Sequence, residues 1–362
     1  MKILHVAETI KGGVATVLRQ LAIEQSQDAQ VDKIVCIVPD TQVKELMPLA
    51  DDCIDIFRRS GRNIKSFFSL TLKLITNVYT LKPDVVHLHS TFAGAIGRIV
   101  IFLMYPLRRP KVIYCPHAFS FLMQGRSRYN NYFSKVERLL LPFTDAVICV
   151  SQFEKDKAVE FGFTPEKLHV VYNGVPEAEP LSKDISNPYP EGKFNLLFVG
   201  RFDFQKGFDI FEKIMPILAD NNCHLTAVGG AVHDSNFIPE KLPATTFTGW
   251  LSSDELKPYF EYADVLIIPS RWEGFAMVPL EAMSYGVPVI ASNCTSFPEM
   301  VVDGETGRMF TLGHPEQVIQ FLESTSVHDW KLMGENGRAL FLSKFTATQM
   351  ISKTKELYSS LF

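Results

Sequence analysis

The sequence has few cysteines and none that are paired. Its 362 residues include six cysteines, which are scattered and form no Cys-x-x-Cys pair. The pattern excludes a disulfide scaffold or a zinc ribbon and fits a reducing cytosol. No run reaches the roughly 18 apolar residues of a membrane span, and the first residues read as a strand rather than a secretory signal. We therefore expect a cytoplasmic protein.

Strong net charge is also absent. The 36 basic and 40 acidic residues leave a formal net charge of −4, which indicates no nucleic-acid partner. The balance hides an asymmetry, because residues 56–138 hold 14 basic and only two acidic residues. This basic region is either an ordinary solvated face or a surface for an anionic membrane or a phosphate-bearing acceptor. Within it, residues 64–75 suit a helix lying on a membrane, although a helix packed on a sheet would look similar.

Short β-branched runs alternate with helical patterns along the chain. Buried strands between helices favour parallel sheets that are covered on both faces. The proline-rich residues 177–192 interrupt this alternation and read as a linker. We predict an α/β protein of two doubly wound domains facing across a cleft, with ligand at the carboxyl ends of the strands. Expected strands are 3–7, 33–38, 85–88, 112–115, 146–150, 170–172, 194–200, 225–228, 246–248, 265–268, 287–291 and 308–310.

Loops after strands carry residues that suit a phosphate-bearing ligand. Gly12 and Gly13 follow the first strand and precede a helix, where backbone amides can approach an anion, although Gly-Gly turns are common. Arg201 and Lys206 lie one loop apart after the first strand of the second domain. Two such cations suit a diphosphate, and the alternative is a solvated pair on a loop. The absence of Gly-x-Gly-x-x-Gly disfavours a dinucleotide-dependent oxidoreductase.

The most informative segment joins a buried strand to a helix in the second domain. Glu273 lies on the connecting loop, and Glu281 lies eight residues later on the helix. Their carboxylates can accept hydrogen bonds from hydroxyl pairs of a ribose or hexose. The amides of Phe275, Ala276 and Met277 can meet the phosphates between them. The alternatives are a helix-capping role for Glu273 and a structural role for Glu281.

In this order, the motifs resemble retaining glycosyltransferases of family 4, of the bacterial surface-polysaccharide type, which have the GT-B architecture. The resemblance rests on Glu273-x7-Glu281, on the loop that holds Arg201 and Lys206, and on the early Gly-Gly loop. Shorter matching pieces extend it over nearly the whole chain: Pro83-Asp-Val-Val-His87-Leu-His89, Pro116-His117, Val150-Ser151 and Val171-Tyr-Asn-Gly-Val175. Pro176 and Ala15 stand where the family often has acidic residues, so no role is assigned to Pro176, and the acceptor-side role of the early Gly-Gly loop stays open.

The resemblance implies a role for each matching residue. Arg201 and Lys206 would hold the donor diphosphate and stabilise the leaving nucleotide. Glu281 would bind the ribose, Glu273 would bind the sugar and β-phosphate, and His117 would contact the sugar from the first domain. The further donor-binding positions are Gly13, Trp250, Leu251, Gly274, Phe275, Ala276 and Met277. The implied domains are 1–176 with 345–362 on the acceptor side, a linker at 177–192, and a nucleotide-sugar domain at 193–344, with the last helix crossing back to the first domain.

The resemblance also implies the reaction. A hexose would pass with retention from a nucleotide diphosphate sugar, expected to be a UDP-sugar, to a glycan acceptor, expected to be lipid-linked. No Asp-x-Asp pair occurs, so we expect no metal and no cofactor, and cations and helix amides would meet the leaving-group charge. We expect a peripheral enzyme on the inner face of the cell membrane. The alternatives are a GDP-mannose-dependent mannosyltransferase, a GT-B-fold epimerase or phosphorylase, and a non-catalytic nucleotide-sugar-binding protein.

Two other groups of residues are weaker candidates. We expect His87 and His89 to point to opposite faces of the sheet, with His89, nearer the carboxyl end of the strand, the better candidate for ligand contact. Four further residues either contact an acceptor or merely form a basic loop: Arg126, Arg128, Tyr129 and Tyr132.

Overall fold

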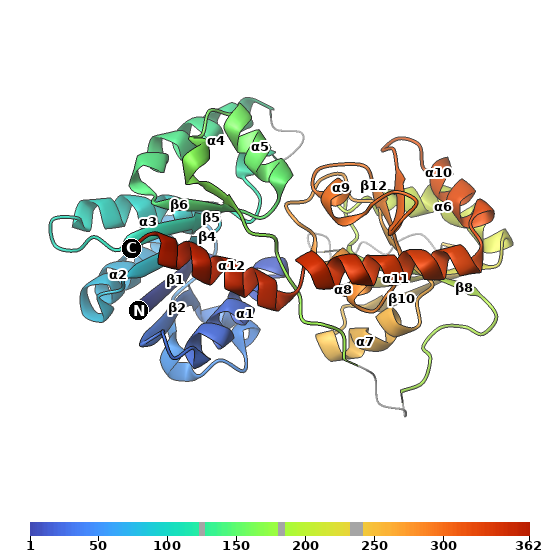
Figure 1. Ribbon diagram of the computed structural model, residues 1–362, viewed down its shortest axis with the longest axis horizontal. Helices are drawn as coiled ribbons and strands as arrows, with labels where there is room; N and C mark the ends of the chain where they lie inside the picture. The colour runs from blue at the N-terminus through green and yellow to red at the C-terminus, as the bar shows by residue number, and fades with distance from the viewer. Residues whose placement is uncertain (123–126, 180–184, 232–241) are drawn as a thin grey trace. The chain divides into compact units, whose positions relative to one another are not determined.

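The computed structural model describes residues 1–122, 127–179, 185–231 and 242–362, with the backbone alone for 127–131. The chain divides into two compact units, Met1–Gly174 with Ala347–Phe362, and Val175–Thr346. Each unit contains a parallel sheet with alternating helices (Figure 1). This confirms the predicted α/β class and the return of the last helix to the first part of the chain.

The first unit is built on a seven-stranded sheet in the order β3-β2-β1-β4-β5-β6-β7. Its strands are β1 Lys2–Ala7, β2 Lys33–Pro39, β3 Ile54–Phe57, β4 Val85–His89, β5 Lys111–Cys115, β6 Ala146–Cys149 and β7 Leu168–Val170. Its helices are α1 Gly13–Gln27, α2 Ile64–Leu81, α3 Thr91–Met104, α4 Ser127–Leu140, α5 Gln152–Glu160 and α12 Ala347–Ser360. The short edge strand β3 was not predicted, and β7 begins two residues before the predicted strand.

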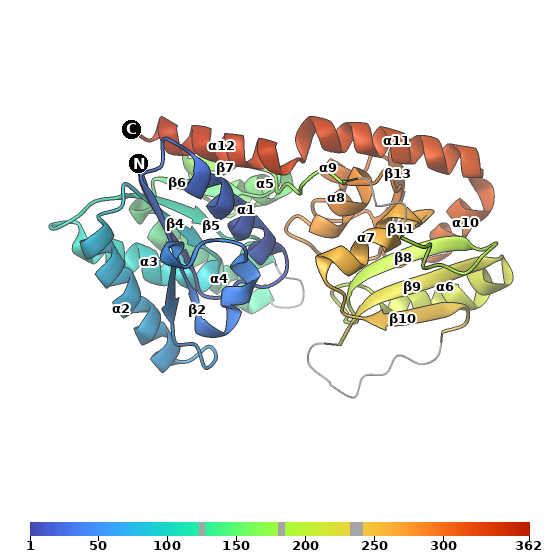
Figure 2. The ribbon, with the colours of Figure 1, turned by 90° about the horizontal axis from the view of Figure 1, so that it is seen from below.

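Alternate residues of β1 and β4 serve the two faces of this sheet. Leu4 and Leu88 belong to the core that packs against α2 and α3. His5, His87 and His89 alternate with those core residues and so lie on the other face, toward α1 and α12, which lie side by side (Figure 2). The prediction that His87 and His89 point to opposite faces is therefore wrong. Residues two apart on a strand share a face, and these two rings have centroids 4.1 Å apart.

The second unit is built on a six-stranded sheet in the order β10-β9-β8-β11-β12-β13. Its strands are β8 Phe194–Arg201, β9 Cys223–Gly230, β10 Thr245–Gly249, β11 Val265–Ile268, β12 Val289–Ser292 and β13 Gly307–Phe310. Its helices are α6 Asp209–Asp220, α7 Ser253–Glu261, α8 Met277–Ser284, α9 Phe297–Met300, α10 Glu316–Ser324 and α11 Val327–Lys344. In the predicted linker 177–192, the described residues form no helix or strand.

Candidate active site

The strand order of the second unit locates its binding edge. From β8 the chain adds β9 and β10 on one side, and then β11, β12 and β13 on the other. The order therefore reverses between β8 and β11, and parallel α/β sheets bind ligands at the carboxyl ends of the strands at such a switch point. Arg201 ends β8, and Glu273 lies in the loop between β11 and α8.

An ion pair joins the two loops at this edge. Lys206 Nζ lies 2.6 Å from Glu273 Oε1, and the side chains are only 21% and 10% exposed. The loops approach closely because Gly207, at φ 71°, packs against the carbonyl oxygen of Pro269, where a Cβ would overlap it. The Glu273 amide also donates to Thr295 Oγ1 at 3.2 Å. Lys206 and Glu273, which are 67 positions apart in the sequence, are thus held together by backbone packing as well as by charge.

Arg201 is held by neighbours in its own loop. Its Nη2 donates to Gln205 Oε1 at 2.8 Å, and its Nη1 lies 3.1 Å from Asp203 Oδ2. Gln205 in turn donates to the Trp272 carbonyl at 3.2 Å, and Asp203 accepts from the Lys206 amide at 2.9 Å. A third of the Arg201 side chain stays exposed, so the guanidinium is oriented and accessible. Sequence reasoning missed Asp203 and Gln205, although both stand between the two predicted cations.

A second ion pair, also missed from the sequence, anchors the start of α6. Arg271 makes two hydrogen bonds of 2.7 Å to the carboxylate of Asp209. Its guanidinium lies over the Phe204 ring, 3.8 Å from the centroid. The hydrogen bond from Arg271 lowers the pKa of Asp209 below its usual range. Arg271 is already paired with Asp209 in a bidentate manner, and it stabilises the loop after β8.

The amino end of α8 lies in the loop that holds Glu273. Ala276 precedes the helix and makes no side-chain capping hydrogen bond. Phe275, Ala276 and Met277 are buried, and Gly274 and Glu281 are half-buried, with Glu281 the fifth residue of the helix. An amino end without a side-chain cap can offer amides to an anion. The predicted placement of Glu273 on the loop and Glu281 on the helix is confirmed.

Two further predicted positions follow β10 in the second unit, and one starts α1 in the first. Trp250 is 59% exposed, and its indole nitrogen lies beside Gly230, the last residue of β9. Leu251 follows it and is half-buried. Gly13 is exposed at the start of α1, after Gly12 with a φ of 56°. The tryptophan therefore lies at the same sheet edge as Arg201, since β9 is the neighbour of β8.

His117 lies in the first unit, two residues beyond the carboxyl end of β5. Its φ of 55° and the φ of 134° at Ala118 put two successive non-glycine residues in the left-handed region. Such strain persists where the surroundings enforce it, often at functional sites. Its Nε2 lies 2.9 Å from His89 Nδ1. Burial lowers the pKa of His117 to about 4, so the ring is neutral at pH 7.

Cations also gather at the carboxyl ends of β1 and β3. Arg59 Nη2 lies 2.8 Å from Glu8 Oε1, and the carboxylate is only 2% exposed. Arg62 Nε lies 3.6 Å from the same oxygen, and its guanidinium lies over the Phe92 ring. Arg62 remains 59% exposed. The predicted acceptor candidates Arg126, Arg128 and Tyr129 lie outside the side chains that the structure describes, whereas Tyr132 is exposed on α4.

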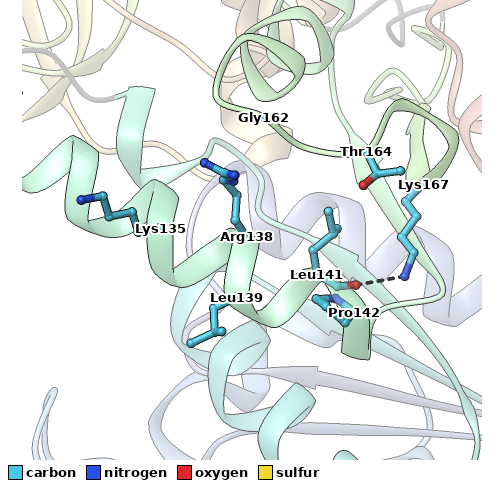
Figure 3. Close-up of a pocket in the computed structure, with 8 residues that line it drawn as sticks. All are labelled: Lys135, Arg138, Leu139, Leu141, Pro142, Gly162, Thr164 and Lys167. Carbon is cyan, nitrogen blue, oxygen red and sulfur yellow. Dashed lines mark hydrogen bonds between the residues drawn. The ribbon is translucent and has the colours of Figure 1, made fainter.

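A basic cavity of about 610 Å³ lies near the amino ends of β6 and β7 in the first sheet. Figure 3 shows Arg138 turned toward Gly162 and Lys167 Nζ donating to the Leu141 carbonyl. Its lining residues are Lys135, Arg138, Leu139, Leu141, Pro142, Gly162, Thr164 and Lys167. Two residues separate 141–143 from the start of β6, and residues 165–167 immediately precede β7. The cavity is therefore at the amino ends of the strands, away from the edge where such sheets bind substrates.

Among the residues that the structure describes, His5, His87 and His89 form the group whose ligand atoms are close enough to hold a metal ion, within 4.8 Å of one another. All three are buried. They lie in the first unit, whereas the Arg201, Lys206 and Glu273 cluster is in the second.

Two family models match the chain. Residues 11–179 match the one described as Glycosyltransferase Family 4, and residues 193–325 match the one described as Glycosyl transferases group 1. A Klebsiella pneumoniae protein described as an uncharacterized 41.2 kDa protein in the cps region is 37% identical, over 99% of this chain and 100% of its own length.

Two more distant proteins carry more specific descriptions. An Escherichia coli protein named UDP-Gal:alpha-D-GlcNAc-diphosphoundecaprenol alpha-1,3-galactosyltransferase is 26% identical, over 87% of each chain. The crystal structure of Anabaena HepE with UDP-glucose superposes with a TM-score of 0.79 at 19% identity, over 99% of this chain and 100% of that one. At that identity, the structural likeness supports the fold alone.

Proposed function

The chain belongs to glycosyltransferase family 4, and from that premise we propose that it transfers a hexose from a UDP-sugar, with retention, to a lipid-diphosphate-linked glycan acceptor in surface-polysaccharide synthesis. The observation that carries the proposal is the cluster of Arg201, Lys206 and Glu273 beside the amino end of α8. It combines two cations with a carboxylate, as a ligand with a diphosphate next to a sugar requires.

The donor would bind with its diphosphate at the two cations. Arg201 is already oriented by Gln205 and Asp203, so little conformational entropy is lost when it contacts phosphate. Lys206 is paired with Glu273 and would share its charge with the β-phosphate when the donor binds. The amides at the start of α8 add further donors, and Glu281 would accept hydrogen bonds from the ribose hydroxyls.

The same cluster would supply the driving force for transfer. Cleavage of the glycosidic bond to phosphate builds negative charge on the leaving diphosphate, which preorganised cations and amides stabilise. The acceptor hydroxyl would attack from the same face, with the departing phosphate taking its proton. Glu273 would contact the hexose, as would the neutral ring of His117. In this proposal, the cations and amides meet the leaving-group charge without a metal ion.

A lipid-linked acceptor is supported by the outer surface of α2 and α3. Apolar residues at intervals of three or four along α2 are exposed, among them Ile64, Phe68 and Tyr79, at 86%, 61% and 66%. Leu103 on the adjacent α3 is 71% exposed. Neither helix contains an acidic residue. No helix in the described part of the chain is long and apolar enough to cross a bilayer. We propose that this apolar and basic surface lies on an anionic leaflet.

Liposome flotation tests the membrane part of the proposal. The wild-type chain should float with vesicles that contain anionic lipid, and Phe68→Ser should weaken that binding. Val327→Ser, which changes an apolar residue of α11 that is also largely exposed, at 72%, is the matched control. If wild type and Phe68→Ser float equally, or neither floats, the membrane surface is wrong.

The donor is tested by thermal unfolding with UDP, GDP, ADP and NAD, each with EDTA and with magnesium. A ligand that binds only the native state raises the melting temperature. We expect a shift that is selective for UDP, persists in EDTA and is lost in Arg201→Ala but kept in Arg308→Ala, an arginine of β13 in the same unit. Selectivity for GDP would move the donor to GDP-mannose, and a shift with NAD alone would refute the assignment. Release of hexose to an acceptor, rather than isomerisation of the donor, then excludes an epimerase.

A further inference from the structure

A chain of hydrogen bonds runs inward from His117. Its Nε2 lies 2.9 Å from His89 Nδ1, and His89 Nε2 lies 2.9 Å from His5 Nδ1. His5 Nε2 lies 2.7 Å from Gln25 Oε1 on α1. His5, His89 and Gln25 are 0%, 0% and 7% exposed. These hydrogen bonds therefore connect His117, in the strained loop after β5, with Gln25 on α1.

All of these rings are neutral at pH 7. Burial lowers the pKa of His5 and of His117 to about 4, and that of His89 well below its usual value. Each neutral ring carries one proton, so a donor at one nitrogen is an acceptor at the other. The direction of every bond in the chain is therefore fixed by the group at its inner end.

We propose that His5, His89 and Gln25 are positioning residues that hold His117 in the tautomer protonated at Nε2, so that its Nδ1 is left as an acceptor for a sugar hydroxyl. Gln25 Oε1 can only accept, so His5 donates from Nε2. His5 Nδ1 then accepts from His89 Nε2, and His89 Nδ1 accepts from His117 Nε2. The role toward the sugar rests on the function proposed above, whereas the tautomer does not.

The orientation of the Gln25 amide decides the direction of the hydrogen bonds. Gln25 Oε1 lies 2.7 Å from His5 Nε2 and accepts its hydrogen bond. Tyr358 on α12 lies near Gln25, which counteracts part of the rise that burial causes in the tyrosine pKa. The Tyr358 hydroxyl also lies 2.6 Å from His87 Nδ1. Turning the Gln25 amide over would reverse every hydrogen bond from His5 to His117, so the orientation of Gln25 selects the tautomer of His117.

The same histidines fit a proton network better than a metal site. His5 Nδ1 and His89 Nε2 are 2.9 Å apart, whereas two ligands on tetrahedral zinc, each at about 2.0–2.1 Å, stand about 3.3 Å apart. A buried dication would also need compensating charge, and the partners named here are neutral. His87 Nε2 has no partner among the described residues. A cavity of about 10 Å³, lined in part by His87, His89 and His117, has room for roughly one water there.

Nitrogen NMR of the histidine rings reads the tautomer without any substrate. In the ¹⁵N-histidine-labelled wild-type chain, His117 should show a protonated Nε2 and a bare Nδ1. In His5→Phe the row of hydrogen bonds from Gln25 to His117 is broken, and His117 should populate both tautomers. Gln25→Met cuts it at the inner end and serves if His5→Phe does not fold. His169, on β7 of the same unit, should keep its spectrum in every variant.

Kinetics then test the role toward the sugar. In His5→Phe we expect the KM for the UDP-hexose to rise roughly five- to tenfold, as for one lost hydrogen bond, with UDP affinity unchanged. A single unchanged His117 tautomer in both variants would overturn the proposal, as would stoichiometric metal in the purified chain that His5→Phe loses. A changed tautomer with an unchanged KM would overturn the sugar contact. If wild type binds no nucleotide, the proposed function fails while the tautomer remains measurable.

Discussion

Lys206→Met removes the charge that joins the two loops of the donor site while keeping a side chain of similar length. The lysine lies 2.6 Å from Glu273, whose side chain is only 10% exposed. Breaking the pair leaves a largely buried carboxylate without its charged partner, which we expect to cost about 1–3 kcal/mol of unfolding free energy. The same change removes a charge-assisted contact to the diphosphate, so UDP affinity should fall by about 1.5–3 kcal/mol, or roughly 10- to 150-fold.

Glu273→Gln should act in the opposite direction on the nucleotide. It frees Lys206 from its partner, so UDP should bind as well as to wild type or more tightly, while hexose transfer falls. In the double variant, UDP affinity should match that of Lys206→Met, because the glutamate affects UDP only through the lysine. The two single variants therefore separate binding of the diphosphate from binding of the sugar.

Calorimetric titration of UDP and urea unfolding of all four proteins measure both effects. Lys257→Met is the control, because that lysine forms an exposed ion pair on α7 of the same unit, and it should leave UDP affinity unchanged. Wild-type UDP affinity in Lys206→Met would refute the assignment of the lysine to the diphosphate. A loss of UDP affinity in Glu273→Gln as large as that in Lys206→Met would refute the division of roles.

Three other predictions concern stability. Gly207→Ala should lower the free energy of unfolding by at least about 2 kcal/mol, because φ is positive there and the new Cβ would overlap the Pro269 carbonyl oxygen. Gly313→Ala should cost less, because a Cβ there meets open space at φ 95°. Equal losses in urea unfolding would contradict the packing argument. Arg98→Met leaves the Glu137 carboxylate buried without the arginine that lies 2.6 Å away, and should cost about 3–5 kcal/mol, so a loss below about 1 kcal/mol in the same assay would count against it. Burial lowers the pKa of His5 from 6.5 to about 4. Between pH 6.5 and pH 4 the His5 ring is therefore protonated in the unfolded protein but neutral in the folded protein. This contribution to stability is therefore present above pH 6.5, and about 3 kcal/mol of it is lost as the pH falls to 4; in His5→Phe, urea unfolding at pH 7.5 and 4.5 should show a smaller difference than in wild type.

Much of the architecture is readable from local pattern. Buried β-branched runs separated by helical repeats predict parallel sheets because each such strand must be covered on both faces. Glu273 and Glu281 could be placed on a loop and a helix because the strand before them ends in turn-forming residues. The edge strand β3 was missed, since its four residues include Asp55 and lack a continuous apolar run. β7 was displaced because the ends of elements depend on hydrogen bonds that the sequence does not reveal.

The sequence by itself determined which residue types follow which strands, and therefore that Arg201, Lys206 and Glu273 belong to loops at binding edges. It did not determine that Lys206 pairs with Glu273, because that contact depends on the register of β8 against β11 and on the fit of Gly207 beneath Pro269. Pairing between residues 67 positions apart is a tertiary event. The hydrogen-bonded histidines are a stronger case, since they need β1, β4 and β5 in register and α1 docked on one face of the sheet. Only the folded chain places Gln25 against His5, and only there does α12 return to the sheet and bring Tyr358 within 2.6 Å of His87.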